Sequence, residues 1–246
     1  VEKFPDCDVF VSFSSRMVIK LLKKKKNEEY KNLPQTLADI DMLGYKHVSV
    51  VSINIFPTDE HEVLKKIVDG FKHFSLANIS CTNALLTKTK ETTAFLKDLN
   101  EQISKDDTAN LYVIHGTPRL DTVGIDSISY SASFLELISE NNFTCSLEGA
   151  FPYFEINDVI KSRIEKLGLK KVQVVPLLLV SGNHYIEDMF EIKDDLSDKF
   201  ESFIVPSLTK SEKFNLIELP MIQNIIEKNI QNTFKMMGIS HKEITY

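Results

Sequence analysis

Short runs of β-branched and aliphatic residues alternate along this chain with longer segments whose apolar residues recur every three or four positions. Apolar runs of four to nine residues suit buried strands, and the longer periodic segments suit amphipathic helices. We expect strands at 9–13, 47–55, around 79, at 111–114, up to 148, at 172–180 and at 203–205. We expect helices at 16–25, from 34, after 58, and at 89–103, 127–139, 156–167, 183–196 and from 220. Strands that alternate with helices throughout predict an α/β fold with parallel sheets.

The strand–helix rhythm occurs twice, and no low-complexity linker separates the two halves. A polar stretch at 104–110 is the best candidate for the boundary. We therefore predict an N-terminal lobe at 1–107, a C-terminal lobe at 108–218 and a final helix at 219–246 that packs back on the first lobe.

Composition excludes several classes of protein. The formal net charge of −6 over 246 residues disfavours a general nucleic-acid binder, which needs a basic field. The three cysteines form no Cys-x-x-Cys pair, so neither a disulfide framework nor a zinc ribbon is indicated. No apolar run approaches the roughly 20 residues of a membrane span, and no signal peptide is visible. We expect a cytoplasmic protein without a nucleic-acid or membrane partner.

Four side chains that suit metal or proton chemistry follow expected strands: His115, His184, Glu60 and Glu148. In open parallel sheets, ligands bind beyond the carboxyl ends of the strands. Imidazole and carboxylate groups can hold a divalent transition metal or transfer protons near neutral pH. A histidine at a strand end can also be purely structural, and Glu60 can simply complement the dipole of the helix that follows it.

Basic residues near the start of the chain offer a further candidate. Four consecutive lysines at 23–26 end an expected helix, where they suit the helix dipole or attract a polyanion. Arg16 follows the first visible strand and can serve either as an anion ligand or in a surface ion pair.

The chain has no Gly-x-Gly-x-x-Gly or Walker loop and no Gly-x-Ser-x-Gly elbow, which disfavours a nucleotide-binding protein or a serine hydrolase.

Several of these segments resemble the anaerobic sirohydrochlorin cobaltochelatase family of the CbiK type. The strongest similarity is Val-Pro-Leu-Leu-Leu-Val-Ser-Gly-Asn-His-Tyr-Ile-Glu-Asp-Met at 175–189, where the family has Pro-Leu-Met-Leu-Val-Ala-Gly-Asp-His-Ala-x-x-Asp-Met. Supporting similarities lie at 13–19, 37–45, 53–60, at the His-Gly-Thr of 115–117 and at the Glu-Gly-Ala-Phe-Pro of 148–152. The similarity runs from about residue 4 to the final helix.

The resemblance implies a chelatase-like fold, with two similar three-layer α/β lobes and a tetrapyrrole cleft between them. It implies insertion of Co²⁺, or of Fe²⁺, into sirohydrochlorin during cobalamin or sirohaem synthesis, which is a lyase reaction without a prosthetic group. The implied catalytic residues are His115, His184 and Glu60, and the implied metal ligands are His115, His184 and Glu148. The implied substrate-binding residues are Ser14, Arg16, Gly116, Thr117, Gly182 and Asn183.

The chain also departs from the family pattern. Family members begin with a strand and a Ser-Phe-Gly-Thr loop, whereas residues 1–5 here correspond to the end of the helix that follows them. We therefore expect the first strand to be missing. This leaves open a non-catalytic protein that binds a tetrapyrrole or a metal on the same fold, and a hydrolase on a similar scaffold is disfavoured. A homo-oligomer is a further expectation.

Overall fold

The computed structural model describes residues 3–27, 29–179 and 183–239, and they form two compact units. Unit 1 comprises Val1–Ser52, Glu60–Asn83 and Ile226–Tyr246, and unit 2 comprises Ile53–Asp59 and Ala84–Ile225. This division differs from the lobes predicted at 1–107 and 108–218, because residues 84–107 belong to unit 2. Within unit 1, Ser49 Oγ lies 2.6 Å from Thr233 Oγ1.

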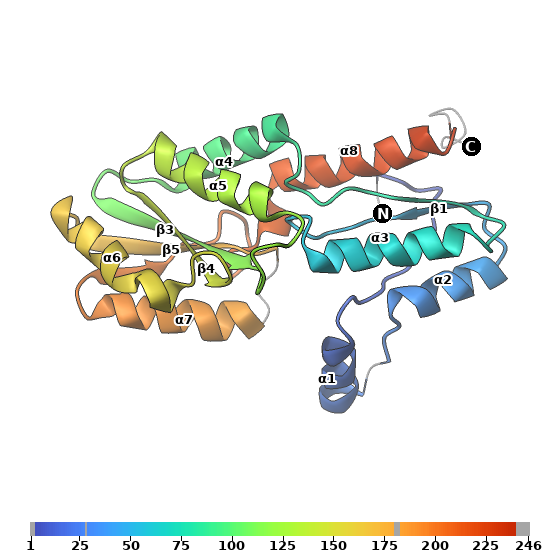
Figure 1. The fold of residues 1–246 in the computed structure, drawn as a ribbon, viewed down its shortest axis with the longest axis horizontal. Coiled ribbons are helices and arrows are strands. Elements are labelled where there is room, and N and C mark those ends of the chain that lie inside the picture. The colour runs from blue at the N-terminus through green and yellow to red at the C-terminus, as the bar shows by residue number, and fades with distance from the viewer. Residues whose placement is uncertain (1–2, 28, 180–182, 240–246) are drawn as a thin grey trace. The chain divides into compact units, whose positions relative to one another are not determined.

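Unit 1 contains a two-stranded parallel sheet flanked by helices (Figure 1). Its elements are α1 (Arg16–Lys26), α2 (Leu33–Met42), β1 (His47–Val50), α3 (Asp59–Lys72), β2 (Asn78–Cys81) and the later part of α8 (Pro220–Met236). A capping box starts α2, where the side chain of Asn32 accepts from the amide of Gln35 and Gln35 reciprocates. The buried core contains Leu33, Leu37, Ile40, Val48, Val50, Val68 and Ile79.

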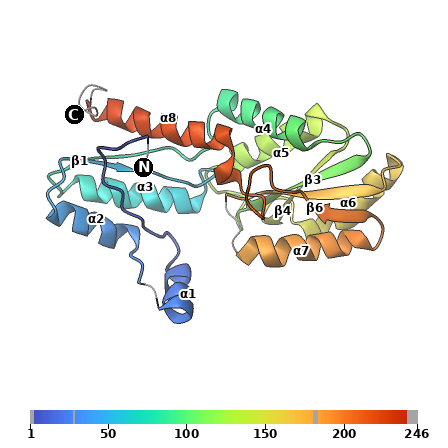
Figure 2. The same ribbon diagram turned by 180° about the vertical axis from the view of Figure 1, so that it is seen from behind.

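Unit 2 contains a four-stranded parallel sheet in the order β4-β3-β5-β6. Its strands are β3 (Thr108–Gly116), β4 (Asn142–Glu148), β5 (Lys171–Leu177) and β6 (Glu201–Ile204). Its helices are α4 (Thr89–Ile103), α5 (Ile125–Ile138), α6 (Tyr153–Lys166), α7 (Asn183–Ser197) and the short 3₁₀ helix η1 (Leu216–Glu218). Helices α4 and α5 cover one face of the sheet, and α6 and α7 cover the other (Figures 1 and 2). Apolar residues therefore dominate both faces of β3 and β5.

A buried amide network fixes the register of the three inner strands of unit 2. Asn110 on β3 donates to Asn142 Oδ1 on β4 over 2.7 Å and accepts from Gln173 Nε2 on β5 over 2.5 Å. Asn142 in turn donates to Asn100 Oδ1 on α4. A shift of one strand by one residue would turn these amides toward apolar neighbours, so the network selects the observed pairing.

Three strand predictions differ from the structure. The run at 9–13 forms a single parallel bridge between Phe13 and Asn32 instead of a strand. The strand expected at 47–55 ends at Val50, and the strand expected at 172–180 ends at Leu177. The other predicted strands and helices are present, with α4 at its predicted bounds. No helix in the described part of the chain is long and apolar enough to cross a membrane.

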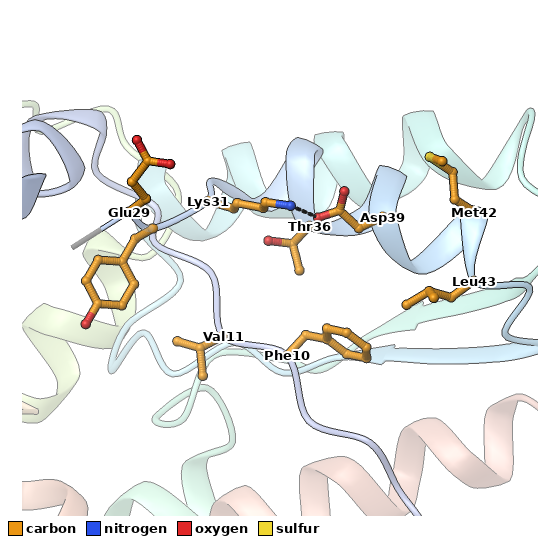
Figure 3. A pocket seen from close by; sticks show the side chains of 9 residues that line it. Phe10, Val11, Glu29, Lys31, Thr36, Asp39, Met42 and Leu43 are labelled. Atoms are coloured by element: carbon orange, nitrogen blue, oxygen red, sulfur yellow. Dashed lines mark hydrogen bonds and ion pairs between the residues drawn. The ribbon is translucent and has the colours of Figure 1, made fainter.

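A shallow groove of about 640 Å³ lies in unit 1 between residues 10–11 and helix α2 (Figure 3). Phe10 and Val11 line one side, and Met42 and Leu43 line the other (Figure 3). All four side chains are exposed, Met42 at 88%. The groove contains none of the site residues predicted from the sequence.

Candidate active site

His115 and Glu148 meet where two neighbouring strands of unit 2 end. His115 is the penultimate residue of β3 and Glu148 is the last residue of β4, and the two strands pair in parallel. The distance from His115 Nδ1 to Glu148 Oε1 is 3.6 Å. Their side chains are 47% and 44% exposed, so a ligand arriving from solvent can reach both. An imidazole and a carboxylate this close can share a divalent metal or a proton.

Two glycines allow this close approach. Gly116 and Gly149 both have positive φ, +81° and +87°, which glycine adopts without strain. A Cβ atom on Gly116 would lie 1.9 Å from the carbonyl oxygen of Glu148, and one on Gly149 would lie 1.9 Å from that of Thr117. The two backbones therefore touch reciprocally just beyond the strands. This contact sets the separation of His115 and Glu148.

The loop after β3 is fixed by contacts within unit 2. Thr117 is buried and its hydroxyl donates to that of Thr122 over 3.3 Å. A Cβ on Gly124 would lie 2.6 Å from the carbonyl oxygen of Pro57, so the loop packs tightly on residues 53–59. The side chain of Thr117 therefore supports this loop.

Strand β5 lies beside β3 and leads toward the predicted residues Gly182, Asn183 and His184. Asn183 and His184 begin α7. Gly182 and the side chains of Asn183 and His184 lie outside the described residues. The three strands β4, β3 and β5 are adjacent and parallel; Glu148 and His115 lie at the ends of β4 and β3, and His184 comes after β5 in the chain.

The other predicted site residues belong to unit 1. Glu60 is exposed in the first turn of α3, and Ser14 is exposed in the bend before α1. Arg16 is the first residue of α1, and its side chain lies outside the described residues. The structure thus brings His115, Glu148, Gly116 and Thr117 together within unit 2. It places Glu60, Ser14 and Arg16 in unit 1.

Sequence reasoning missed a buried histidine beside Glu60. His61 is 3% exposed, and its Nδ1 lies 2.9 Å from Ser52 Oγ. Burial chiefly lowers the pKa of His61, Lys65 lowers it further, and Glu62 opposes them. The signal was present in the helical spacing, since His61 lies seven residues before the buried Val68 on the same face of α3.

No group of three or more His, Cys, Asp or Glu side chains that could hold a metal occurs among the described residues. The pair of His115 and Glu148 supplies two ligands of the kind that cobalt and iron accept.

A family model described as cobalt chelatase (CbiK) matches residues 1–235. The chain belongs to the CbiK cobalt chelatase family. A curated relative, the sirohydrochlorin cobaltochelatase of Salmonella typhimurium strain LT2, is 22% identical over 187 residues, which are 75% of this chain and 68% of that protein. The resemblance inferred from the sequence is therefore confirmed, and so is the function class, a metal chelatase.

Two solved structures share the fold of this CbiK-family chain. SirB from Bacillus subtilis with Fe³⁺ aligns with a TM-score of 0.58 at 15% identity, over 82% of this chain and 77% of that one. The sirohydrochlorin chelatase SirB from Bacillus subtilis subspecies spizizenii, in complex with cobalt, aligns with a TM-score of 0.56 at 13% identity, over 96% of this chain and 91% of that one. These similarities confirm the predicted chelatase-like fold.

Proposed function

We propose that this chain is a sirohydrochlorin cobaltochelatase that inserts Co²⁺ into the tetrapyrrole, with Fe²⁺ as the alternative metal substrate. Membership of the family and the name of the Salmonella relative support the activity. The single structural observation that carries the proposal is the exposed pair of His115 and Glu148, 3.6 Å apart beyond adjacent parallel strands. The metal is a substrate here, and we propose no prosthetic group.

The proposed metal ligands are His115, Glu148 and His184. Their positions after β3, β4 and β5 favour convergence, because the carboxyl ends of parallel strands meet at one edge of a sheet. Imidazole and carboxylate ligands bind divalent cobalt or iron and can leave some coordination positions of the metal open. Open positions allow the pyrrole nitrogens to replace protein ligands one after another.

Insertion also requires the loss of two pyrrole N–H protons. A neutral imidazole or a carboxylate can accept them, because its ordinary pKa lies near or below neutral pH. We propose His115, His184 and Glu60 as the catalytic residues for this transfer. A bent macrocycle, held so that its nitrogen lone pairs face the metal, lowers the barrier further.

The carboxylates of the tetrapyrrole need polar partners. We propose Arg16 as the guanidinium partner, because its planar group binds carboxylates in two-point fashion. Further proposed contacts come from Ser14, Gly116, Thr117, Gly182 and Asn183. We also propose that the protein acts in the cytoplasm. We further propose that it forms a homo-oligomer, and sedimentation of the purified protein tests this.

Substitution of the proposed metal ligands tests the function. His115→Ala and His184→Ala should each lower the rate of Co²⁺ insertion more than about 100-fold, because a lost ligand removes the metal from the strand ends. The measurement is the absorbance change of sirohydrochlorin with Co²⁺, and in parallel with Fe²⁺, over several turnovers. His73→Ala is the matched control, because His73 is an exposed histidine that directly follows the last residue of α3, whereas Glu60 lies in its first turn.

Unchanged insertion by His184→Ala would contradict the proposed ligand set. A wild-type protein that shifts the absorbance by one equivalent and then stops would instead be a tetrapyrrole or metal carrier. The ratio of the initial rates with Co²⁺ and Fe²⁺ decides which metal this chain prefers.

A further inference from the structure

Three buried polar side chains form a small hydrogen-bonded cluster in unit 1. Ser52 follows β1, Thr82 follows β2, and His61 lies in the first turns of α3. Their exposed fractions are 1%, 3% and 3%. The amide of Ser52 donates to Thr82 Oγ1 over 2.8 Å, and Ser52 Oγ lies 2.9 Å from His61 Nδ1. The cluster therefore links both strand ends to the start of one helix.

The position of this cluster in the chain is unusual. The backbone leaves unit 1 after Ser52, returns at Glu60 and leaves again after Asn83. Ser52, His61 and Thr82 therefore each lie within one residue of a place where the chain crosses between units. Helix α3 begins at Asp59, directly at one of these crossings.

The hydrogen bonds of the cluster also constrain the orientation of α3. The apolar face of α3 also contains Leu64 and Val68, which pack in the core of unit 1. Apolar contacts of this kind hold a helix against a sheet but are not directional. A hydrogen bond has a preferred length and angle, so the contact between His61 and Ser52 defines the rotation and axial position of the first turn of α3.

Glu60 directly precedes His61 in that same turn. We propose that His61 is a positioning residue, which holds Glu60 in the orientation for proton transfer through its buried hydrogen bond to Ser52. This inference rests on the proposed function, in which Glu60 accepts a pyrrole proton. His61 itself is buried, so in this proposal it acts through Glu60.

Kinetics of metal insertion test the positioning role. His61→Leu keeps the volume but removes the hydrogen bond, so we expect kcat to fall about tenfold while KM changes less than about twofold. His61→Asn places an amide where Nδ1 was and should restore kcat to within about threefold of the wild type. Thr36→Val, a buried polar change in α2 of the same unit, is the control and should leave both constants unchanged.

A double-mutant cycle with Glu60→Gln separates positioning from general damage. If His61 acts through Glu60, His61→Leu should lower kcat less than about twofold in the Glu60→Gln background. Equal losses in both backgrounds would overturn the proposal. Equal losses for His61→Leu and His61→Asn would overturn it as well, and so would an effect on KM alone.

Amide hydrogen exchange gives a readout that does not depend on activity. In His61→Leu, the amides of residues 59–63 should exchange faster than in the wild type, while those of α2 should not change. Unchanged exchange at the start of α3 would overturn the proposal whatever the kinetics show. If the wild-type protein inserts no metal, the proposed function fails, and the role of His61 as a positioning residue for catalysis fails with it. Faster exchange at 59–63 would in that case leave a structural anchor only.

Discussion

The two units bring their strand ends together in different ways. In unit 2, the ends of β3 and β4 approach each other at Gly116 and Gly149, and the neighbouring His115 and Glu148 remain exposed. In unit 1, the amide of Ser52 after β1 donates to the side chain of Thr82 after β2, the side chain of Ser52 contacts His61, and His61 is buried. The contact in unit 2 leaves the neighbouring side chains exposed, whereas the contacts in unit 1 bury them in a hydrogen-bonded cluster.

The sheet of unit 2 is also more completely paired and buried than the sheet of unit 1. Strand β3 has a partner on each side and is almost entirely buried. In the described part of the chain, β1 has β2 as its single partner strand. Apolar side chains at Val9, Phe10 and Val11 remain exposed in unit 1. Unit 2 is therefore expected to be the more stable scaffold, and it carries the exposed histidine–carboxylate pair.

The largest expected effect comes from Gly149→Ala in unit 2. The Cβ of an alanine at position 149 would lie 1.9 Å from the carbonyl oxygen of Thr117, so the two strand ends must separate. The backbone at this position also has a positive φ of +87°, which strains alanine. We expect a loss of at least about 3 kcal/mol in the free energy of unfolding, and loss of metal insertion as His115 and Glu148 move apart. Chemical denaturation and the absorbance assay measure the two effects.

Gly168→Ala is the matched control for this substitution. Gly168 has a similar φ of +72°, but nothing lies within 4 Å of the added Cβ. Its cost should be about 1 kcal/mol, from the backbone conformation alone, with normal insertion. Equal losses in the free energy of unfolding at the two glycines would show that the close contact between the strand ends does not contribute to stability.

A smaller difference is expected when one leucine is shortened in each core. Leu111 on β3 is fully buried between two strands, whereas Leu37 on α2 is buried in unit 1, whose α2 also borders the open groove. Leu111→Ala should cost about 4 kcal/mol and Leu37→Ala about 2.5 kcal/mol, because a loosely enclosed site relaxes more around the lost atoms. Hydrogen exchange resolved by unit measures both costs, and the reverse order would contradict the comparison.

Most elements could be predicted from the sequence because their signals are local. The helix at Thr89–Ile103 has one continuous apolar face, and the apolar run that forms β5 is too short for a buried helix. The run at 9–13 has the same apolar pattern but forms no strand. A strand needs a partner along its length, and here the amide of Phe13 alone finds one, at Lys31 O. Strand β1 ends early because the amide of Ser52 bonds to a side chain.

The candidate site was predictable in part for the same reason. His115 and Glu148 follow recognisable strands, so their proximity follows from the rule for parallel sheets. The reciprocal contact of Gly116 and Gly149 could not be predicted, because it depends on how two distant backbones meet. The bond between His61 and Ser52 depends in the same way on the packing of α3 against β1.

The smallest expected effect is a difference in pH dependence between the units. In unit 1, burial lowers the pKa of His61 from its ordinary value of 6.5, with Lys65 adding to the effect and Glu62 opposing it. As the pH falls, His61 in the unfolded chain therefore takes up a proton at a higher pH than His61 in the folded chain does. The stability that neutral His61 provides above pH 6.5 is lost as the pH falls through the lowered pKa.

Unit 2 should respond at a lower pH. Burial of Asp195 by itself raises its pKa, but hydrogen bonds from Lys161, Tyr153 and Asn157 outweigh this effect, and the pKa lies below its ordinary value of 3.8. The stability from this carboxylate is present above pH 3.8 and is lost only below it. Amide exchange between pH 7 and 4 should therefore show unit 1 loosening before unit 2. His61→Asn, which cannot titrate, should remove that early loss, and an unchanged profile would assign it to another group.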